Sequence, residues 1–134
     1  MHAVSPQPRC EVAIPVTVKP LPANGRLRCF SASSVNVSVN GVALGFYEVD
    51  DTIRIISSFL TEDQRIEMTM TVPSTGVSIT ATGRPRWHST TSIGGSTQYL
   101  KVGILLEEME LEDKIKWLWF LKDAGRATFQ DMLA

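Results

Sequence analysis

Alternation of apolar and polar residues dominates the chain from Val12 to Leu106. Four stretches show it clearly: Val12–Val18, Ile66–Val72, Val77–Ala81 and Leu100–Leu106. Because successive side chains of a β-strand point to opposite faces, each stretch predicts a strand with one buried face. In the third stretch the same phase continues through Gly83 and Pro85 to Trp87, which places these residues on the buried face as well.

Two further strands are predicted between the first and second of these stretches. One runs from Arg26 to about Val37, and its alternation shifts near Ala32–Ser34, which indicates a bulge. The other covers Val42–Tyr47 and follows the turn dipeptide Asn40-Gly41.

Turn-forming residues occupy the segments between the predicted strands. Pro20–Gly25 and Pro73–Gly76 combine Pro, Gly, Asn, Ser and Thr, which favour turns. Ser89–Thr97 is rich in Ser, Thr and Gly and predicts an exposed loop. About six strands joined mostly by short turns indicate a mostly-β fold, a six-stranded antiparallel β-barrel that is closed or nearly closed.

The period changes at the C-terminus, where a helix is predicted to follow the barrel. The residues of one helical stripe are Leu111, Ile115, Leu118 and Lys122. Gly125 is a typical helix stop. We therefore expect an N-terminal arm over residues 1–10, the barrel and its helix over 11–124, and a tail over 125–134.

This helix is apolar over more than one stripe, since Trp117, Phe120 and Leu121 point away from Leu111 and Ile115. Its aromatic residues are Trp117, Trp119 and Phe120. One interpretation wedges the helix between the barrel and the tail. The other makes these three residues a surface for a protein partner or for a second copy of the chain.

Length, charge and composition limit the classes of partner and the location expected for the chain. The chain has 134 residues, which suits one domain, and its net charge of −1 argues against nucleic-acid binding. No apolar run approaches the ~20 residues of a membrane span, and Met1–Arg9 lacks the apolar core of a secretory signal, so a cytoplasmic protein is expected. Cys10 and Cys29 are interpreted as reduced thiols, with a single bridge between them left open.

Catalytic motifs are missing from the sequence. The two histidines are His2 and His88, and no HExxH, CxxC, GxGxxG or GxSxG spacing occurs. His88 alternates with Trp87 and is expected to face solvent or a ligand. The acidic run Glu107–Asp113 fits a solvated helix start rather than a metal site. We therefore predict neither an enzyme nor a metal or cofactor site.

Two features suit a small anionic ligand. Asn36 and Ser38 share one strand face, and they offer an amide for a base edge and a hydroxyl for a phosphate oxygen. Gly41 permits positive φ and a close backbone approach. Arg9 presents a planar guanidinium that suits phosphate or guanine. By spacing alone, an ordinary hairpin turn and a solvated arginine explain the same residues.

Taken together, these residues resemble the PilZ family. Its pattern is Arg-x-x-x-Arg on an N-terminal arm, a strand, and later Asp or Asn-x-Ser-x-x-Gly. Asn36, Ser38 and Gly41 match the second motif in full, and Arg9 stands where the second arginine of the first motif belongs. Gly-Arg-Pro-Arg-Trp at 83–87 and Val102-Gly103-Ile104 are similar to later strands of the family. The resemblance covers Pro8 to Lys122.

The resemblance implies a split barrel that binds cyclic di-GMP (c-di-GMP), with the arm closing over the guanines. Arg9 then clamps a base or phosphate, Asn36 reads a guanine edge, and Ser38 and Gly41 seat the ligand. A receptor of this kind transmits the signal to a protein partner, and homo-oligomerisation stays open.

The sequence departs from the family pattern at Ser5, where the first arginine belongs. Arg84 and Arg86 share a strand face and are candidates to supply the charge, as are Arg26 and Arg28. Two hypotheses remain. The first is a c-di-GMP receptor, and the second is a degenerate PilZ adaptor that acts through its C-terminal helix without nucleotide.

Overall fold

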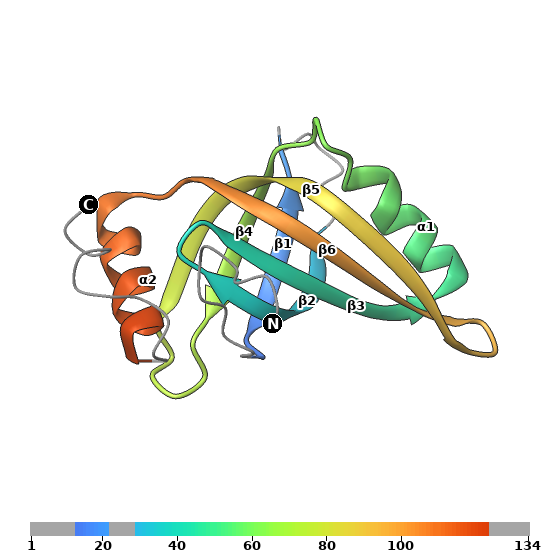
Figure 1. Ribbon diagram of the computed structural model, residues 1–134, viewed down its shortest axis with the longest axis horizontal. Helices are drawn as coiled ribbons and strands as arrows, with labels where there is room; N and C mark the ends of the chain where they lie inside the picture. The colour runs from blue at the N-terminus through green and yellow to red at the C-terminus, as the bar shows by residue number, and fades with distance from the viewer. Residues whose placement is uncertain (1–12, 22–28, 124–134) are drawn as a thin grey trace, which may run out of the picture.

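Six strands, all paired antiparallel, close into a barrel in the order β1-β2-β3-β6-β5-β4. The structure, a computed structural model, describes residues 13–21 and 29–123. Its elements are β1 (Pro15–Pro20), β2 (Phe30–Ser38), β3 (Gly41–Val49), α1 (Asp50–Phe59), β4 (Ile66–Thr71), β5 (Ser78–Gly94), β6 (Thr97–Glu108) and α2 (Leu111–Asp123) (Figure 1). The predicted six-stranded antiparallel barrel with a C-terminal helix is confirmed.

The core is built from the alternating apolar positions. Ile66, Met68 and Met70 of β4 are fully buried, and the register sets Met68 opposite Val18 and Met70 opposite Val16 of β1. Each such side chain contributes about 1.5–3 kcal/mol when it leaves water, so the alternation itself holds the barrel together. The other strands supply the remaining wall of the core, including Val37, Leu44, Phe46, Ile79, Leu100 and Val102.

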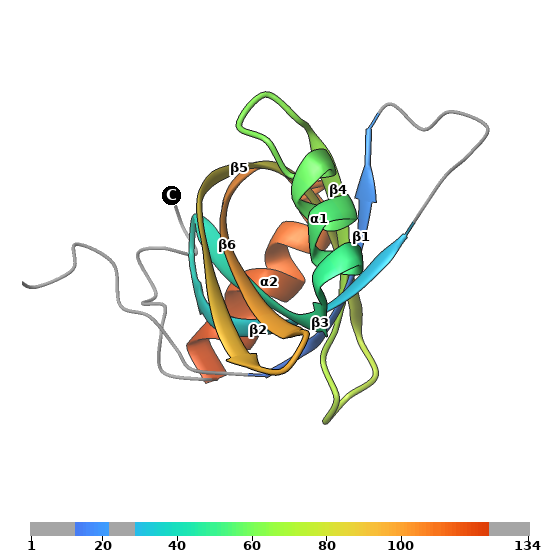
Figure 2. The ribbon, with the colours of Figure 1, turned by 90° about the vertical axis from the view of Figure 1, so that its right-hand side faces the viewer.

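The β5–β6 hairpin extends far beyond the barrel (Figures 1 and 2). β5 pairs with β4 only over Ser78–Gly83, whereas it pairs with β6 as far as Gly94. The prediction of a loop over Ser89–Thr97 is therefore wrong, although these residues are largely exposed as expected. Residues 89–94 of β5 are all exposed, so no apolar alternation marks this part of the strand. The turn lies at Gly94 and Gly95, both with positive φ.

An aromatic pair fixes β3 to β6 outside the barrel. Tyr47 lies opposite Tyr99, and the two rings stack with centroids 4.3 Å apart. A Cβ at Gly45 would overlap the Tyr99 ring, so glycine provides the space that this ring occupies. Burial, and secondly the neighbouring Tyr47, raises the pKa of Tyr99 above its ordinary value. The Tyr99 phenol therefore stays protonated at neutral pH.

Helix α1 was not predicted. It buries Ile53 and Ile56 and packs against β3 and β6. Two signals were present in the sequence, since these isoleucines are three residues apart and Asp50 and Asp51 occupy the first turn, where the helix dipole favours acidic side chains.

Strand β2 contains a bulge close to the predicted position. The structure describes the strand from Phe30 onward, and Arg26 and Arg28 at its predicted start lie outside the described residues. The register shifts between Ser34 and Asn36, just after the expected Ala32–Ser34. The bulge therefore lies directly before the predicted ligand motif.

Helix α2 closes one end of the barrel, as Figure 1 shows. It buries Trp117, Leu118 and Leu121 and lies against β5. The Trp117 Nε1–H donates a hydrogen bond of 3.3 Å to the Val39 carbonyl in the β2–β3 turn. No helix in residues 13–21 and 29–123 is long and apolar enough to cross a membrane.

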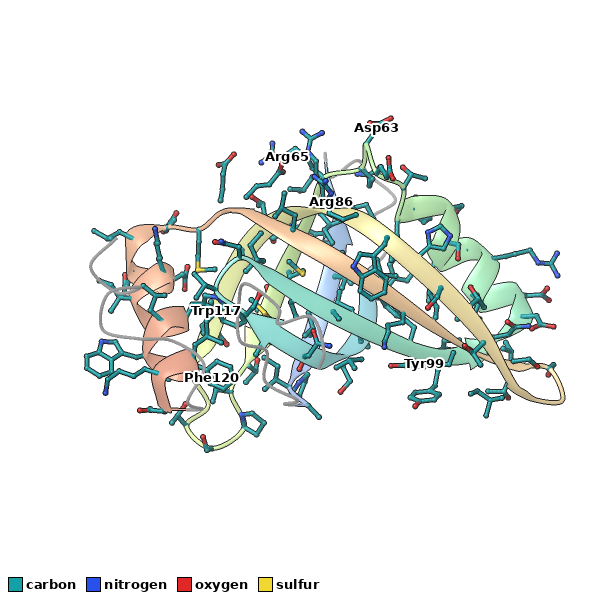
Figure 3. The ribbon with its side chains drawn as sticks, viewed as in Figure 1. Asp63, Arg65, Arg86, Tyr99, Trp117 and Phe120 are labelled. Carbon is teal, nitrogen blue, oxygen red and sulfur yellow. The ribbon has the colours of Figure 1, made fainter. Side chains whose placement is uncertain are left out.

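The surface predicted from Trp117, Trp119 and Phe120 needs correction. Trp117 is 1% exposed and Phe120 packs partly buried against the core, so only Trp119 of the three is exposed. Figure 3 shows Trp117 and Phe120 on the side of α2 that meets the barrel. The exposed apolar stripe of α2 instead consists of Leu111, Ile115 and Trp119, because their spacing of four places them on the opposite face.

Ser34 joins β2 to the segment that precedes β1. Its buried hydroxyl accepts a hydrogen bond of 2.9 Å from the Ile14 N–H, and its own N–H donates to the Ile14 carbonyl at 3.0 Å. The Ile14 amide thus depends on a side chain for its partner.

We expect Ser34→Ala to lower the free energy of unfolding by about 1–3 kcal/mol, because it leaves the buried Ile14 N–H without its acceptor. Urea-induced unfolding measures this difference. Ser33→Ala is the matched control, since Ser33 is exposed and its loss should change stability by less than about 0.5 kcal/mol. Equal effects of the two substitutions would contradict this role of Ser34.

Candidate functional site

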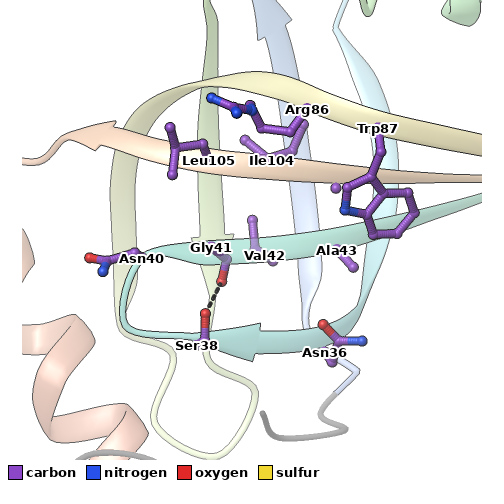
Figure 4. Close-up of a pocket in the computed structure, with 11 residues that line it drawn as sticks. Asn36, Ser38, Asn40, Gly41, Val42, Ala43, Arg86, Trp87, Ile104 and Leu105 are labelled. Atoms are coloured by element: carbon purple, nitrogen blue, oxygen red, sulfur yellow. Dashed lines mark hydrogen bonds between the residues drawn. The ribbon is translucent and has the colours of Figure 1, made fainter. Parts of the chain in front are cut away.

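A cleft of about 330 Å³ lies on the outer face of the barrel, where β2, β3, β5 and β6 run side by side. We call it the outer cleft. Figure 4 shows Asn36 and Ser38 on one side and Arg86 and Trp87 on the other. The residues used below are Asn36, Ser38, Gly41, Arg86, Trp87 and Gly103, all of which line it. Three of the predicted ligand residues and one of the two predicted strand arginines therefore meet in one place.

The β2–β3 turn supplies the polar side of the cleft. Ser38 lies opposite Gly41, and its hydroxyl donates a hydrogen bond of 3.4 Å to the Gly41 carbonyl. The hydroxyl oxygen keeps lone pairs for a further donor. The side-chain amide of Asn36 makes no hydrogen bond to another described residue, so both its oxygen and its nitrogen are available.

Gly41 matters because it has no Cβ, not because of its φ angle. Its φ is not positive, so the expected use of a left-handed conformation is not found. A Cβ at this position would lie 3.2 Å from the Ile104 carbonyl oxygen, which is tighter than ordinary packing. Glycine at this position therefore lets β3 pass close to the backbone of β6.

A bulge in β5 provides the other side of the cleft. Pro85 pairs with Ile104 and Trp87 with Gly103, so Arg86 is an extra residue between two successive pairs. The extra residue shifts the alternation by one, and Trp87 is 43% exposed instead of buried with Pro85. The predicted inward phase of Trp87 is wrong for this reason.

Trp87 lies over Gly103. A Cβ on Gly103 would overlap the Trp87 indole, so only glycine at this position lets the ring pack against the backbone of β6. The predicted site did not include Trp87, although Trp87 and Gly103 both stand in the stretches that resemble later strands of the family. The cleft thus gains a fixed aromatic surface.

Arg86 is the described arginine whose charge is not neutralised. Arg84 pairs with Glu107 at 3.1 Å and Arg65 with Glu108 at 3.3 Å, and Arg54 pairs with Asp51 at 3.5 Å. Within residues 13–21 and 29–123, no carboxylate pairs with Arg86. The outer cleft therefore offers one uncompensated positive charge to an anion.

The remaining predicted residues lie elsewhere. Arg84 points to Glu107 and does not line the cleft, and His88 is exposed without lining it. Arg9 and Cys10 lie outside the described residues, whereas Cys29 is an exposed free thiol. The described part of the chain contains no group of His, Cys, Asp and Glu residues arranged to hold a metal ion.

Comparison with solved structures gives similar folds. The chain matches K. pneumonia MrkH in its apo state with a TM-score of 0.67 and 14% identity over 93% of this chain. It matches the Bacillus subtilis inhibitor of motility MotI/DgrA with a TM-score of 0.64 and 11% identity over 92%. Borreliella burgdorferi PlzA in complex with c-di-GMP matches with a TM-score of 0.55 and 9% identity over 87%.

All three proteins contain PilZ domains. The barrel has the PilZ fold. The chain spans about half the length of these proteins, namely 53% of MrkH, 52% of MotI/DgrA and 50% of PlzA. Neither a protein-family model nor a curated protein matches the sequence. The assignment of the PilZ fold therefore comes from the three-dimensional structure, and it agrees with the motif at Asn36, Ser38 and Gly41.

Proposed function

We propose that the outer cleft of this PilZ barrel binds c-di-GMP and that the chain is a receptor for this second messenger. The observation that carries the proposal is the meeting of Asn36, Ser38 and Gly41 with an unpaired Arg86 and an exposed Trp87 in one cleft. Two of the similar structures name the ligand: MrkH is described as a c-di-GMP-dependent transcription regulatory factor, and PlzA was solved with c-di-GMP bound.

The chemistry of the cleft suits each part of a cyclic dinucleotide. The Asn36 amide offers a donor and an acceptor to a guanine edge, and the Ser38 hydroxyl reaches a phosphate oxygen. The Arg86 guanidinium forms charge-assisted hydrogen bonds with a phosphate. Trp87 presents a flat apolar face on which a purine stacks.

We propose that Arg86 also replaces the positive charge that the family pattern has where this chain has Ser5. A PilZ barrel that lacks the first arginine of the arm motif needs another cation beside the ligand, and Arg86 lines the cleft without a carboxylate partner. We propose that Arg9 adds a second guanidinium from the arm. Binding then orders the arm and changes the surface that the receptor offers to a protein partner.

Calorimetric titration of the whole chain with c-di-GMP tests the proposal, with GTP as the specificity control. We expect saturable binding of c-di-GMP and no saturation with GTP. Trp87→Ala should weaken binding roughly fivefold to hundredfold, because base stacking on an aromatic ring contributes about 1–3 kcal/mol. Trp119→Ala, on exposed α2 surface, is the matched control and should leave binding unchanged. Absence of heat with c-di-GMP at several hundred micromolar would defeat the receptor proposal.

A second candidate function is the adaptor that acts without nucleotide. One observation favours it, the exposed apolar stripe Leu111, Ile115 and Trp119 on α2, which suits a protein partner. Under this proposal Trp119→Ala disrupts a protein complex and c-di-GMP has no effect on it. The titration above separates the two candidates.

A further inference from the structure

The projecting hairpin leaves an unpaired strand edge on β5. Beyond Gly83, β5 pairs only with β6, and among the described residues no other strand lies along its second edge. Figure 2 shows this edge on the side of the hairpin away from α1. The register with β6 is regular from Trp87 to Ser92, and we call this segment the β5 edge.

The β5 edge lacks the features that normally protect a strand edge. Natural edges carry Lys, Pro, inward charges or bulges, or they are short. On the opposite edge of the same extension, β3 is short beyond its last β2 pair at Gly45, carries Glu48 and runs directly into α1. The β5 edge holds no Pro and no Asp, Glu, Lys or Arg, and its residues are exposed. It is therefore suited to pairing with another strand.

The hydrogen-bonding pattern shows which groups of the β5 edge are free. The Leu106 N–H donates to the Asn40 carbonyl, so Leu106 faces β3. Orientation alternates along β6, and the β3–β6 register is unbroken, so Tyr99, Lys101 and Gly103 face β5. Their partners on β5, which are Thr91, Ser89 and Trp87, therefore use their backbone groups on β6.

The alternate residues of β5 have their backbone groups directed the other way. These residues are His88, Thr90 and Ser92, and all three are exposed. Their N–H and C=O groups form a row along the open edge, separated by the spacing that an antiparallel partner strand requires.

We propose that a second copy of this chain pairs antiparallel with the β5 edge, with Thr90 on the two-fold axis. In this register Thr90 faces Thr90 of the second copy and His88 faces its Ser92, so every outward backbone group is matched. The same register brings Trp87 beside Ile93 of the second copy, and these are the two large hydrophobic residues exposed on β5. Hydrogen bonding and apolar contact thus select one register independently.

The segment is also self-complementary in charge. A charged residue on or next to the two-fold axis would lie close to its own copy, which is destabilising, but the β5 edge has no acidic side chain and no Lys or Arg. The Thr–Thr pair on the axis and the Ser89–Thr91 pairs beside it are favourable cross-strand pairs. Because the contact is one strand wide, the dimer is expected to be weak, in the range of small transient interfaces. The dimer does not depend on nucleotide.

Sedimentation equilibrium of the whole chain from ~10 to ~500 µM tests the proposal, in a range that suits weak interfaces. We expect a reversible monomer–dimer equilibrium. Thr90→Lys and Thr90→Glu, which put like charges face to face on the axis, should each give monomer throughout. A one-to-one mixture of these two variants should restore the dimer, because opposite charges then meet. Thr91→Lys is the matched control, since Thr91 faces Ser89 rather than itself, and should keep most of the dimer.

Three results would overturn the proposal: a wild-type chain that stays monomeric at the highest concentration, a dimer that survives Thr90→Lys, or a mixture of the two charge variants that stays monomeric. Circular dichroism establishes that each variant is folded. Amide hydrogen exchange provides a measurement without substitutions. With rising concentration, the amides of His88, Thr90 and Ser92 should gain protection, whereas those of Ser89 and Thr91 are already bonded to β6.

Discussion

Trp117→Ala is expected to destabilise the barrel by about 3–5 kcal/mol, the largest effect on folding that we predict for a single side chain. Trp117 is 1% exposed, stacks at a tilt on Phe120 with ring centroids 5.7 Å apart, and bonds to the Val39 carbonyl. Its removal leaves a large cavity where α2 closes the barrel and also leaves that carbonyl without its donor. Urea-induced unfolding followed by circular dichroism measures the loss. A protein of this size has a total stability of about 5–15 kcal/mol, so the variant should be only marginally folded.

The matched control lies two residues away. Trp119 is on the exposed face of α2, where its ring lies under the Lys122 ammonium at 5.0 Å. An exposed contact of this kind contributes about 0.5–1 kcal/mol, so Trp119→Ala should cost no more than that. If both tryptophans proved equally dispensable, α2 would not be part of the core as the structure describes it.

Arg86→Ala is expected to reduce the affinity for c-di-GMP about tenfold to hundredfold. A hydrogen bond to a charged group contributes about 1.5–3 kcal/mol, and each 1.4 kcal/mol is a factor of ten in affinity. Because no described carboxylate competes for Arg86, its charge is fully available to the phosphate. Calorimetric titration of both proteins at one salt concentration measures the change.

Arg84→Ala is the control for this measurement. Arg84 is two residues away on the same strand but pairs with Glu107 and does not line the outer cleft. Its loss should leave the affinity within about twofold, because no contact to the ligand is removed. A loss of affinity with Arg84→Ala and none with Arg86→Ala would show that the cation acts from another place and would refute this assignment of the site.

The sequence predicted those parts of the fold in which one face of a strand is buried. Met68 and Met70 alternate with polar residues because one side of β4 faces the core, and the same holds for the other barrel strands. The β5 strand of the hairpin is exposed on both faces from Ser89 onward, so Ser89–Thr97 carries no alternation and was taken for a loop. Helix α1 is short and buries only Ile53 and Ile56, which leaves a weak period between two strands.

The candidate site was also predicted only in part. Asn36, Ser38 and Gly41 were found from their spacing, because a strand followed by a tight turn keeps that spacing in three dimensions. Trp87 was not found, because the strand pattern gives Arg86 the ordinary polar position and nothing in the sequence marks it as an extra residue. For the same reason the sequence did not show that Arg86 lines the cleft while Arg84 does not. The pairing of β5 with β6, which only the structure shows, decides the positions of Trp87 and of both arginines.

The bulge at Arg86 has an evolutionary consequence. An inserted residue inside a strand usually turns every later side chain to the wrong face, but here Pro85 and Trp87 keep successive partners on β6 and Arg86 is accommodated between them. Deleting that one codon would remove the unneutralised guanidinium and leave the barrel interior and the indole over Gly103 in place. A lineage of such barrels can therefore gain or lose its attraction for anions through a single in-frame indel.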